Sequence, residues 1–118
     1  MKNASDVAAA PPLISEFADE PDMLELIDCF LSELPERLRE IESADGEQNL
    51  AVLASLAHKL KGAAGGYGYS TITEAARTLE QRARASDGVE TVRSAVAELK
   101  GLCARACAGR AQHEKRAA

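Results

Sequence analysis

Apolar side chains recur every three or four residues along four segments of the chain, and polar side chains occupy the positions between them. This spacing places the apolar residues on one face of an α-helix. It predicts amphipathic helices over about residues 21–43, 46–67, 71–85 and 87–110. Short connections separate these segments, which allows the four apolar faces to meet in one core. The pattern therefore predicts an all-α fold, an antiparallel up-and-down four-helix bundle.

Local sequence signals refine the ends of these helices. The apolar segment 12–17 precedes the first helix and is expected to form a short extra N-terminal helical segment. Pro35 predicts a kink inside the first helix, because proline lacks an amide donor and crowds the preceding turn. Asp45 is expected to cap the second helix, and Thr71 with Glu74 has the spacing of a capping box for the third.

The length of 118 residues suits one small domain. We expect the helical bundle to span residues 13–110, between a flexible N-terminal tail at 1–12 and a polar C-terminal tail at 111–118. The first residues lack the sustained apolar stretch of a signal peptide, and no apolar run approaches the roughly 18 residues that cross a membrane. A cytoplasmic protein without membrane contacts is therefore the default expectation.

Charge is distributed unevenly along the chain, whose net charge is −5. Residues 16–47 carry 12 acidic and 2 basic side chains, whereas residues 48–118 carry 6 acidic and 11 basic ones. We interpret this as an acidic first helix packed among more basic helices. Aromatic residues make up only 3% of the chain and do not alternate with the basic ones, so nucleic-acid binding is not expected.

The three cysteines give little support for a metal site. Cys103 and Cys107 have helical i, i+4 spacing, but only His113, in the predicted tail, lies near them in sequence. Tetrahedral sites need three or four converging ligands. We therefore expect no metal and no cofactor of the protein's own, and we interpret Cys103 and Cys107 as small buried side chains.

His58 stands out in the segment LAHKLKGAAGGYGY, which contains four of the eight glycines of the chain. On a helical wheel its ring lies about 130° from the centre of the apolar face, so it is expected to face solvent. The neighbouring positions on the wheel are small apart from one lysine: Ala51, Ala54, Ser55, Lys61, Gly62 and Gly65. An ordinary solvated face carries long polar side chains, so this bare patch is a candidate functional surface.

These residue types suit phosphoryl transfer through phosphohistidine. A neutral imidazole is a nucleophile, and a nearby lysine can counter the charge of a dianionic group bound to the ring. We therefore predict His58 as the phosphoacceptor and Lys61 as the residue that stabilises the phosphoryl group. The candidate partner-binding residues, which leave room for another protein to approach, are Ala51, Ala54, Ser55, Gly62 and Gly65.

The segment AHKLKGAAGGYG resembles the signature of histidine-containing phosphotransfer (HPt) domains, approximately His-x-x-Lys-Gly-small-small-x-x-aromatic/aliphatic-Gly. The matching residues are His58, Lys61, Gly62, Ala63, Ala64, Tyr67 and Gly68. The resemblance covers about residues 20–110 and includes FLSELPERL in the first helix. It implies an exposed phosphoacceptor at His58, a phosphoryl-stabilising role for Lys61, and room for the phosphoryl group beside Gly62.

The resemblance also implies partners. HPt domains have no kinase activity of their own. They exchange a phosphoryl group with aspartates of response-regulator receiver domains or accept it from a sensor or hybrid histidine kinase, and the receiver supplies Mg²⁺. The residues after His58 differ from those of histidine-kinase dimerisation helices, which favours a monomer. Two alternatives stay open: the phosphoacceptor domain of a larger chemotaxis-type or hybrid kinase, and a helical docking module that is not phosphorylated.

Overall fold

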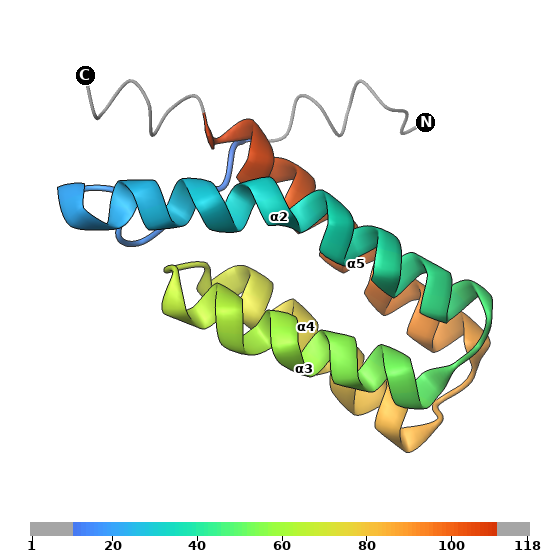
Figure 1. Ribbon diagram of the computed structural model, residues 1–118. Coiled ribbons are helices and arrows are strands. Elements are labelled where there is room, and N and C mark those ends of the chain that lie inside the picture. Colours follow the sequence, from blue (N-terminus) through green and yellow to red (C-terminus); the bar gives the residue numbers. More distant parts are fainter. Residues whose placement is uncertain (1–10, 111–118) are drawn as a thin grey trace.

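The computed structural model describes residues 11–110, which form four α-helices (Figure 1). They are α2 (Pro21–Gly46), α3 (Leu50–Gly66), α4 (Ser70–Ala85) and α5 (Val89–Ala108). Three short connections, 47–49, 67–69 and 86–88, reverse the chain, so that α2 packs against α3 and α5, and α4 packs against the same two helices. The predicted all-α four-helix bundle is confirmed. None of the helices in the described part of the chain is long and apolar enough to cross a membrane.

The core is built from the apolar faces that the periodicity predicted. Leu60 and Ala64 of α3 are fully buried, which fixes the inner face of the helix that carries His58. An aromatic cluster closes one end of the core: the ring of Phe30 stacks on Tyr67 at 5.1 Å and on Tyr69 at 5.7 Å between ring centroids. Such stacked pairs add packing energy beyond the area that they bury.

α2 continues through Pro35 and ends three residues later than predicted, at Gly46. Pro35 is exposed. Figure 1 shows α2 changing direction near its middle, in agreement with the bend expected from a proline inside a helix. The first helix thus keeps its continuity while it curves over its neighbours.

The short helix expected at residues 12–17 is a wrong prediction, because residues 11–15 have no regular secondary structure and a turn covers residues 16–19. The amide of Glu16 donates to the carbonyl of Gly68 at 2.8 Å, and the Ser15 hydroxyl donates to the carbonyl of Tyr67 at 2.6 Å. The segment therefore satisfies its polar groups on the α3–α4 connection rather than within a helix of its own.

The expected cap of α3 is also corrected. The side chain of Asn49, not Asp45, accepts a hydrogen bond from the Val52 amide at 3.3 Å. Because α2 extends to Gly46, Asp45 stays inside α2, and its carboxylate lies 3.7 Å from the Arg93 guanidinium. The extra turn of α2 thus moves the start of α3 from residue 46 to residue 50.

The predicted capping box of α4 does not form. The helix begins at Ser70, one residue earlier than predicted, and its N-cap residue Tyr69 makes no capping hydrogen bond through its side chain. Glu74 instead forms an ion pair with Arg77 one turn along the helix. Residues 1–10 of the N-terminal tail expected at 1–12, and the whole C-terminal tail expected at 111–118, with His113, lie outside the described residues.

Candidate functional site

His58 lies on the outer face of α3, where its side chain is 61% exposed. The exposure predicted from the helical wheel is confirmed. Ala57 precedes His58 and Leu60 follows two residues after it, and both are fully buried, so the helix is anchored to the core on its inner face. The imidazole is consequently presented to solvent on a rigid element, close to the middle of a well-packed helix.

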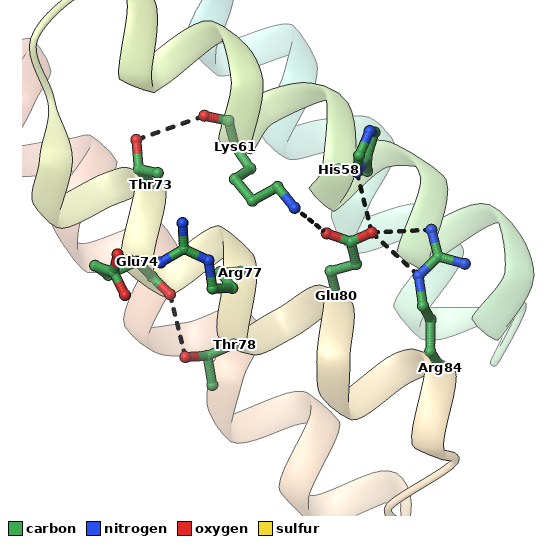
Figure 2. A network of polar contacts seen from close by, with 8 residues as sticks. All are labelled: His58, Lys61, Thr73, Glu74, Arg77, Thr78, Glu80 and Arg84. Atoms are coloured by element: carbon green, nitrogen blue, oxygen red, sulfur yellow. Dashed lines mark hydrogen bonds and ion pairs between the residues drawn. The ribbon is translucent and has the colours of Figure 1, made fainter.

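Glu80 of α4 is the residue of this site that the sequence analysis missed. Its side chain is 10% exposed and points toward α3 (Figure 2). One carboxylate oxygen, Oε2, lies 3.1 Å from His58 Nδ1, and the other, Oε1, accepts a hydrogen bond from Lys61 Nζ at 2.8 Å. A single carboxylate therefore joins the two residues that the sequence predicted as functional.

Arg84 completes this cluster from the next turn of α4. Its Nε and Nη2 atoms donate to Oε2 of Glu80 at 3.1 and 2.9 Å, so His58 and Arg84 share one oxygen. The hydrogen bond from Lys61, with that from Arg84, lowers the pKa of Glu80 from 4.5 to about 2 although burial opposes this shift. The carboxylate is therefore ionised at neutral pH.

This arrangement selects one tautomer of the neutral imidazole. An ionised carboxylate only accepts hydrogen bonds, so Nδ1 of His58 must carry the proton that it donates to Glu80. Nε2 then carries the lone pair, and Figure 2 shows this second nitrogen pointing away from Glu80. The ring thus offers a nucleophilic nitrogen on its exposed side.

The predicted small-residue surface is present with one exception. Ala51, Ser55, Gly62 and Gly65 are exposed, whereas Ala54 is buried. α3 packs against both α2 and α4, so its buried arc is wider than a single stripe and includes Ala54. Ala54 is therefore corrected from a surface residue to a core residue.

Gly62 is not required by packing or by the backbone. A Cβ atom at this position would meet no heavy atom within 4 Å, and its φ is not positive. The open space above Gly62 lies one turn from His58 along the same helix. The glycine therefore keeps side-chain atoms away from the exposed ring rather than permitting a special backbone conformation.

A groove of about 520 Å³ between α2 and α3 adjoins this surface. It begins beside Lys59, the residue after His58, and combines apolar and charged side chains. Its lining is Ser32, Glu33, Glu36, Arg37, Glu40, Ile41, Leu56 and Lys59. The groove therefore lies on the α2 side of the helix that carries His58, whereas Glu80 contacts that helix from α4.

The cysteines are placed mostly as expected. Cys103 is buried and Cys107 partly buried, and burial raises the pKa of the Cys103 thiol to about 12. Cys29 is exposed. Across residues 11–110, no three His, Cys, Asp or Glu side chains gather in a way that could hold a metal ion.

We expect Glu80→Gln to lower the free energy of unfolding at neutral pH by about 1–2 kcal/mol, because it removes charge-assisted hydrogen bonds. The pKa of about 2 in the folded protein lies below the ordinary value of 4.5. The stabilisation is therefore complete above about pH 4.5 and is lost as the pH falls toward 2. Urea titrations at several pH values should show the difference from wild type shrinking over this range.

Glu74→Gln is the matched control, since Glu74 lies on the same helix but is exposed and pairs only locally with Arg77. Its effect on unfolding should stay within about 0.5 kcal/mol at every pH. A difference between Glu80→Gln and wild type that does not change with pH would contradict the assigned role of the carboxylate charge.

The fold and the site together define a helical bundle that presents one histidine, hydrogen-bonded to a carboxylate, on an otherwise small-residue surface. A family model described as Hpt domain matches residues 25–109, which include nearly all four helices. The chain belongs to the Hpt domain family. It is accordingly a histidine-containing phosphotransfer module of phosphorelays. Searches of curated proteins and of solved structures found no match.

Proposed function

We propose that this protein carries a phosphoryl group on Nε2 of His58 and exchanges it with aspartates of response-regulator receiver domains. The observation that carries the proposal is the 3.1 Å contact between Nδ1 and Glu80, which leaves Nε2 as the exposed nucleophile. The family membership supports the same chemistry at a histidine. The cytoplasmic location and the monomeric state stay predictions from the sequence.

The proposed reaction is a direct displacement at phosphorus. The Nε2 lone pair attacks the phosphorus of an aspartyl phosphate, the Nε2–P bond forms, and the aspartate carboxylate leaves with the electrons of the broken P–O bond. The ring becomes positively charged as the bond forms. Its Nδ1–H then faces the ionised Glu80, which stabilises that charge without moving. Return of the phosphoryl group to an aspartate follows the same steps in reverse.

Lys61 supplies a cation beside the phosphorylated ring. Its ammonium is held by Glu80 at 2.8 Å, and its side chain is 26% exposed. A dianionic phosphoryl group on Nε2 attracts this flexible point charge, which offsets part of the added negative charge. We propose that the receiver supplies Mg²⁺ and that this chain supplies no cofactor and no kinase activity of its own.

Gly62→Ala is expected to change stability and transfer in opposite directions. The substitution removes a glycine from a helix interior where a Cβ meets nothing, so the free energy of unfolding should rise by about 0.5–1 kcal/mol. The new methyl group stands on the proposed docking surface, so phosphoryl transfer from a receiver should slow about tenfold. Urea unfolding and single-turnover transfer kinetics measure the two effects.

Gly101→Ala is the matched control for Gly62→Ala. Gly101 lies inside α5, and a Cβ there also meets nothing within 4 Å. It should give a similar gain in stability with an unchanged transfer rate. Equal transfer rates in the two variants would remove Gly62 from the docking surface.

The test of the proposed function is a panel of phosphorylated receiver domains incubated with the purified protein. We expect at least one receiver to pass on a phosphoryl label that is labile in acid and stable in alkali, as a phosphohistidine is. Failure of every receiver to transfer the label, despite measurable binding, would favour a docking module that is not phosphorylated. Labelling that occurs only when this domain and a kinase are joined in one chain would favour the alternative that the protein is the acceptor domain of a larger kinase.

A further inference from the structure

We propose that Arg84 is a positioning residue that weakens the interaction of Glu80 with the His58 ring and so lengthens the lifetime of the phosphohistidine. The inference rests on the proposed phosphorylation of His58. Arg84 lies on α4, not on the helix that carries His58. Its side chain is 61% exposed, and its Nε and Nη2 atoms bind the same Glu80 oxygen as the histidine.

The geometry places these groups in competition. Oε2 of Glu80 lies 3.1 Å from His58 Nδ1, 3.1 Å from Arg84 Nε and 2.9 Å from Arg84 Nη2 (Figure 2). Lys61 donates to the other oxygen, Oε1, so the ring and the guanidinium both contact Oε2. The charge on Oε2 is divided between a neutral or protonated imidazole and a permanently charged guanidinium.

The charges in the cluster also favour this role. Lys61 on α3 and Arg84 on α4 are both cations, and Glu80 on α4 is the one anion that contacts His58 within the described residues. Two cations against one carboxylate leave a net positive charge before the ring is counted. Each additional cation near Oε2 makes a proton on the phosphorylated ring less favourable.

The proton on Nδ1 controls how easily the phosphoryl group leaves. With Nδ1 protonated, water attacks phosphorus, the Nε2–P bond breaks, and its electron pair returns to Nε2, so that a neutral imidazole and dihydrogen phosphate are the products. Without that proton the leaving ring would be an imidazolate anion, which is a far poorer leaving group. Glu80 favours the proton, and Arg84 reduces that effect by sharing Oε2.

The experiment measures the lifetime of chemically phosphorylated protein. A small phosphoramidate donor transfers its phosphoryl group to Nε2 and releases ammonia, so no receiver is needed. After removal of the donor, Arg84→Ala should lose its label about threefold to tenfold faster than wild type at neutral pH, which is the effect of one hydrogen bond of ordinary strength. Arg84→Lys, which restores a cation, should return the lifetime toward that of wild type.

Arg77→Ala is the matched control, because Arg77 is exposed on the same helix and pairs with Glu74. It should keep the wild-type lifetime. In a Glu80→Gln background, Arg84→Ala should have no effect, since the shared carboxylate is gone. An equal loss of lifetime with and without Glu80 would show that Arg84 acts on the phosphoryl group directly, and it would overturn the inference. An unchanged lifetime in Arg84→Ala would also overturn it.

A second measurement separates this inference from the proposed function. Nitrogen NMR of the unphosphorylated protein reports the hydrogen bond that His58 Nδ1–H donates to Glu80. Arg84→Ala should strengthen this hydrogen bond and shift the Nδ1 resonance, and Arg77→Ala should not change it. A wild-type protein that takes no label would contradict the proposed function, whereas unchanged nitrogen shifts in Arg84→Ala would contradict the competition for Oε2 by themselves.

Discussion

Replacement of His58 by glutamine is expected to reduce phosphoryl labelling to background. Glutamine keeps a polar side chain within reach of Glu80, but its amide nitrogen has a delocalised lone pair and is not a nucleophile. The His58 side chain is 61% exposed, so the fold should be retained, with a change in unfolding free energy within about 0.5 kcal/mol. The measurement is label retained on the protein after incubation with a phosphorylated receiver, with circular dichroism to check folding.

The second histidine of the chain provides the matched control for this result. His113→Gln removes the same type of side chain from the same protein and should leave labelling at the wild-type level. Label that survives in His58→Gln and disappears in His113→Gln would transfer the acceptor role to His113. Label that survives in both variants would show that the phosphoryl group is not carried by either imidazole.

The parts of the fold that depend on local pattern were predictable from the sequence. Four helices follow from apolar spacing, and the outward orientation of His58 follows from the angle between its position and the apolar face of α3. Both are properties of a single helix. The helical wheel gave the wrong prediction for Ala54. The width of the buried face of a helix depends on how many helices pack against it, and α3 packs against two.

The helix ends were less predictable, since several residues compete to begin or end each helix. Asp45 and Asn49 are both good N-cap residues, and the extension of α2 to Gly46 decided in favour of Asn49. In the same way, Glu74 found a partner in Arg77, and the capping box was not formed. These choices differ by about 1 kcal/mol or less, so tertiary packing decides them.

Glu80 was missed because its role depends on contact between two helices. It lies 22 residues from His58 in the sequence, and periodicity within α4 says nothing about which residue of α3 it will face. One signal was available: Glu80 borders the buried residues Leu79 and Ala83 on the wheel of α4, and Arg84 follows four residues later. An acidic residue beside an apolar face needs a partner, but the sequence does not identify that partner.

Gly68→Ala is expected to cause the largest loss of stability of the substitutions considered, about 2–4 kcal/mol in the free energy of unfolding. Gly68 has φ of +84°, which L-residues rarely adopt. A Cβ at this position would also lie 2.5 Å from Ser15 Oγ and 3.0 Å from the Glu16 amide nitrogen. Ser15 and Glu16 cannot move away cheaply, since both hydrogen-bond to the carbonyls of the same turn.

Alanine substitutions at two other glycines distinguish backbone strain from steric overlap as the cause of the Gly68→Ala effect. Gly88 has φ of +104° but open space at its Cβ, so Gly88→Ala reports backbone strain alone and should cost about 1–2 kcal/mol. Gly66→Ala has neither problem and should not destabilise the protein. Urea unfolding should show that the loss in free energy of unfolding decreases in the order Gly68→Ala, Gly88→Ala, Gly66→Ala.

A loss for Gly68→Ala no greater than that for Gly88→Ala would mean that residues 15–17 move away from the new methyl group at little cost. The N-terminal segment would then not be part of what holds the end of the His58 helix in place.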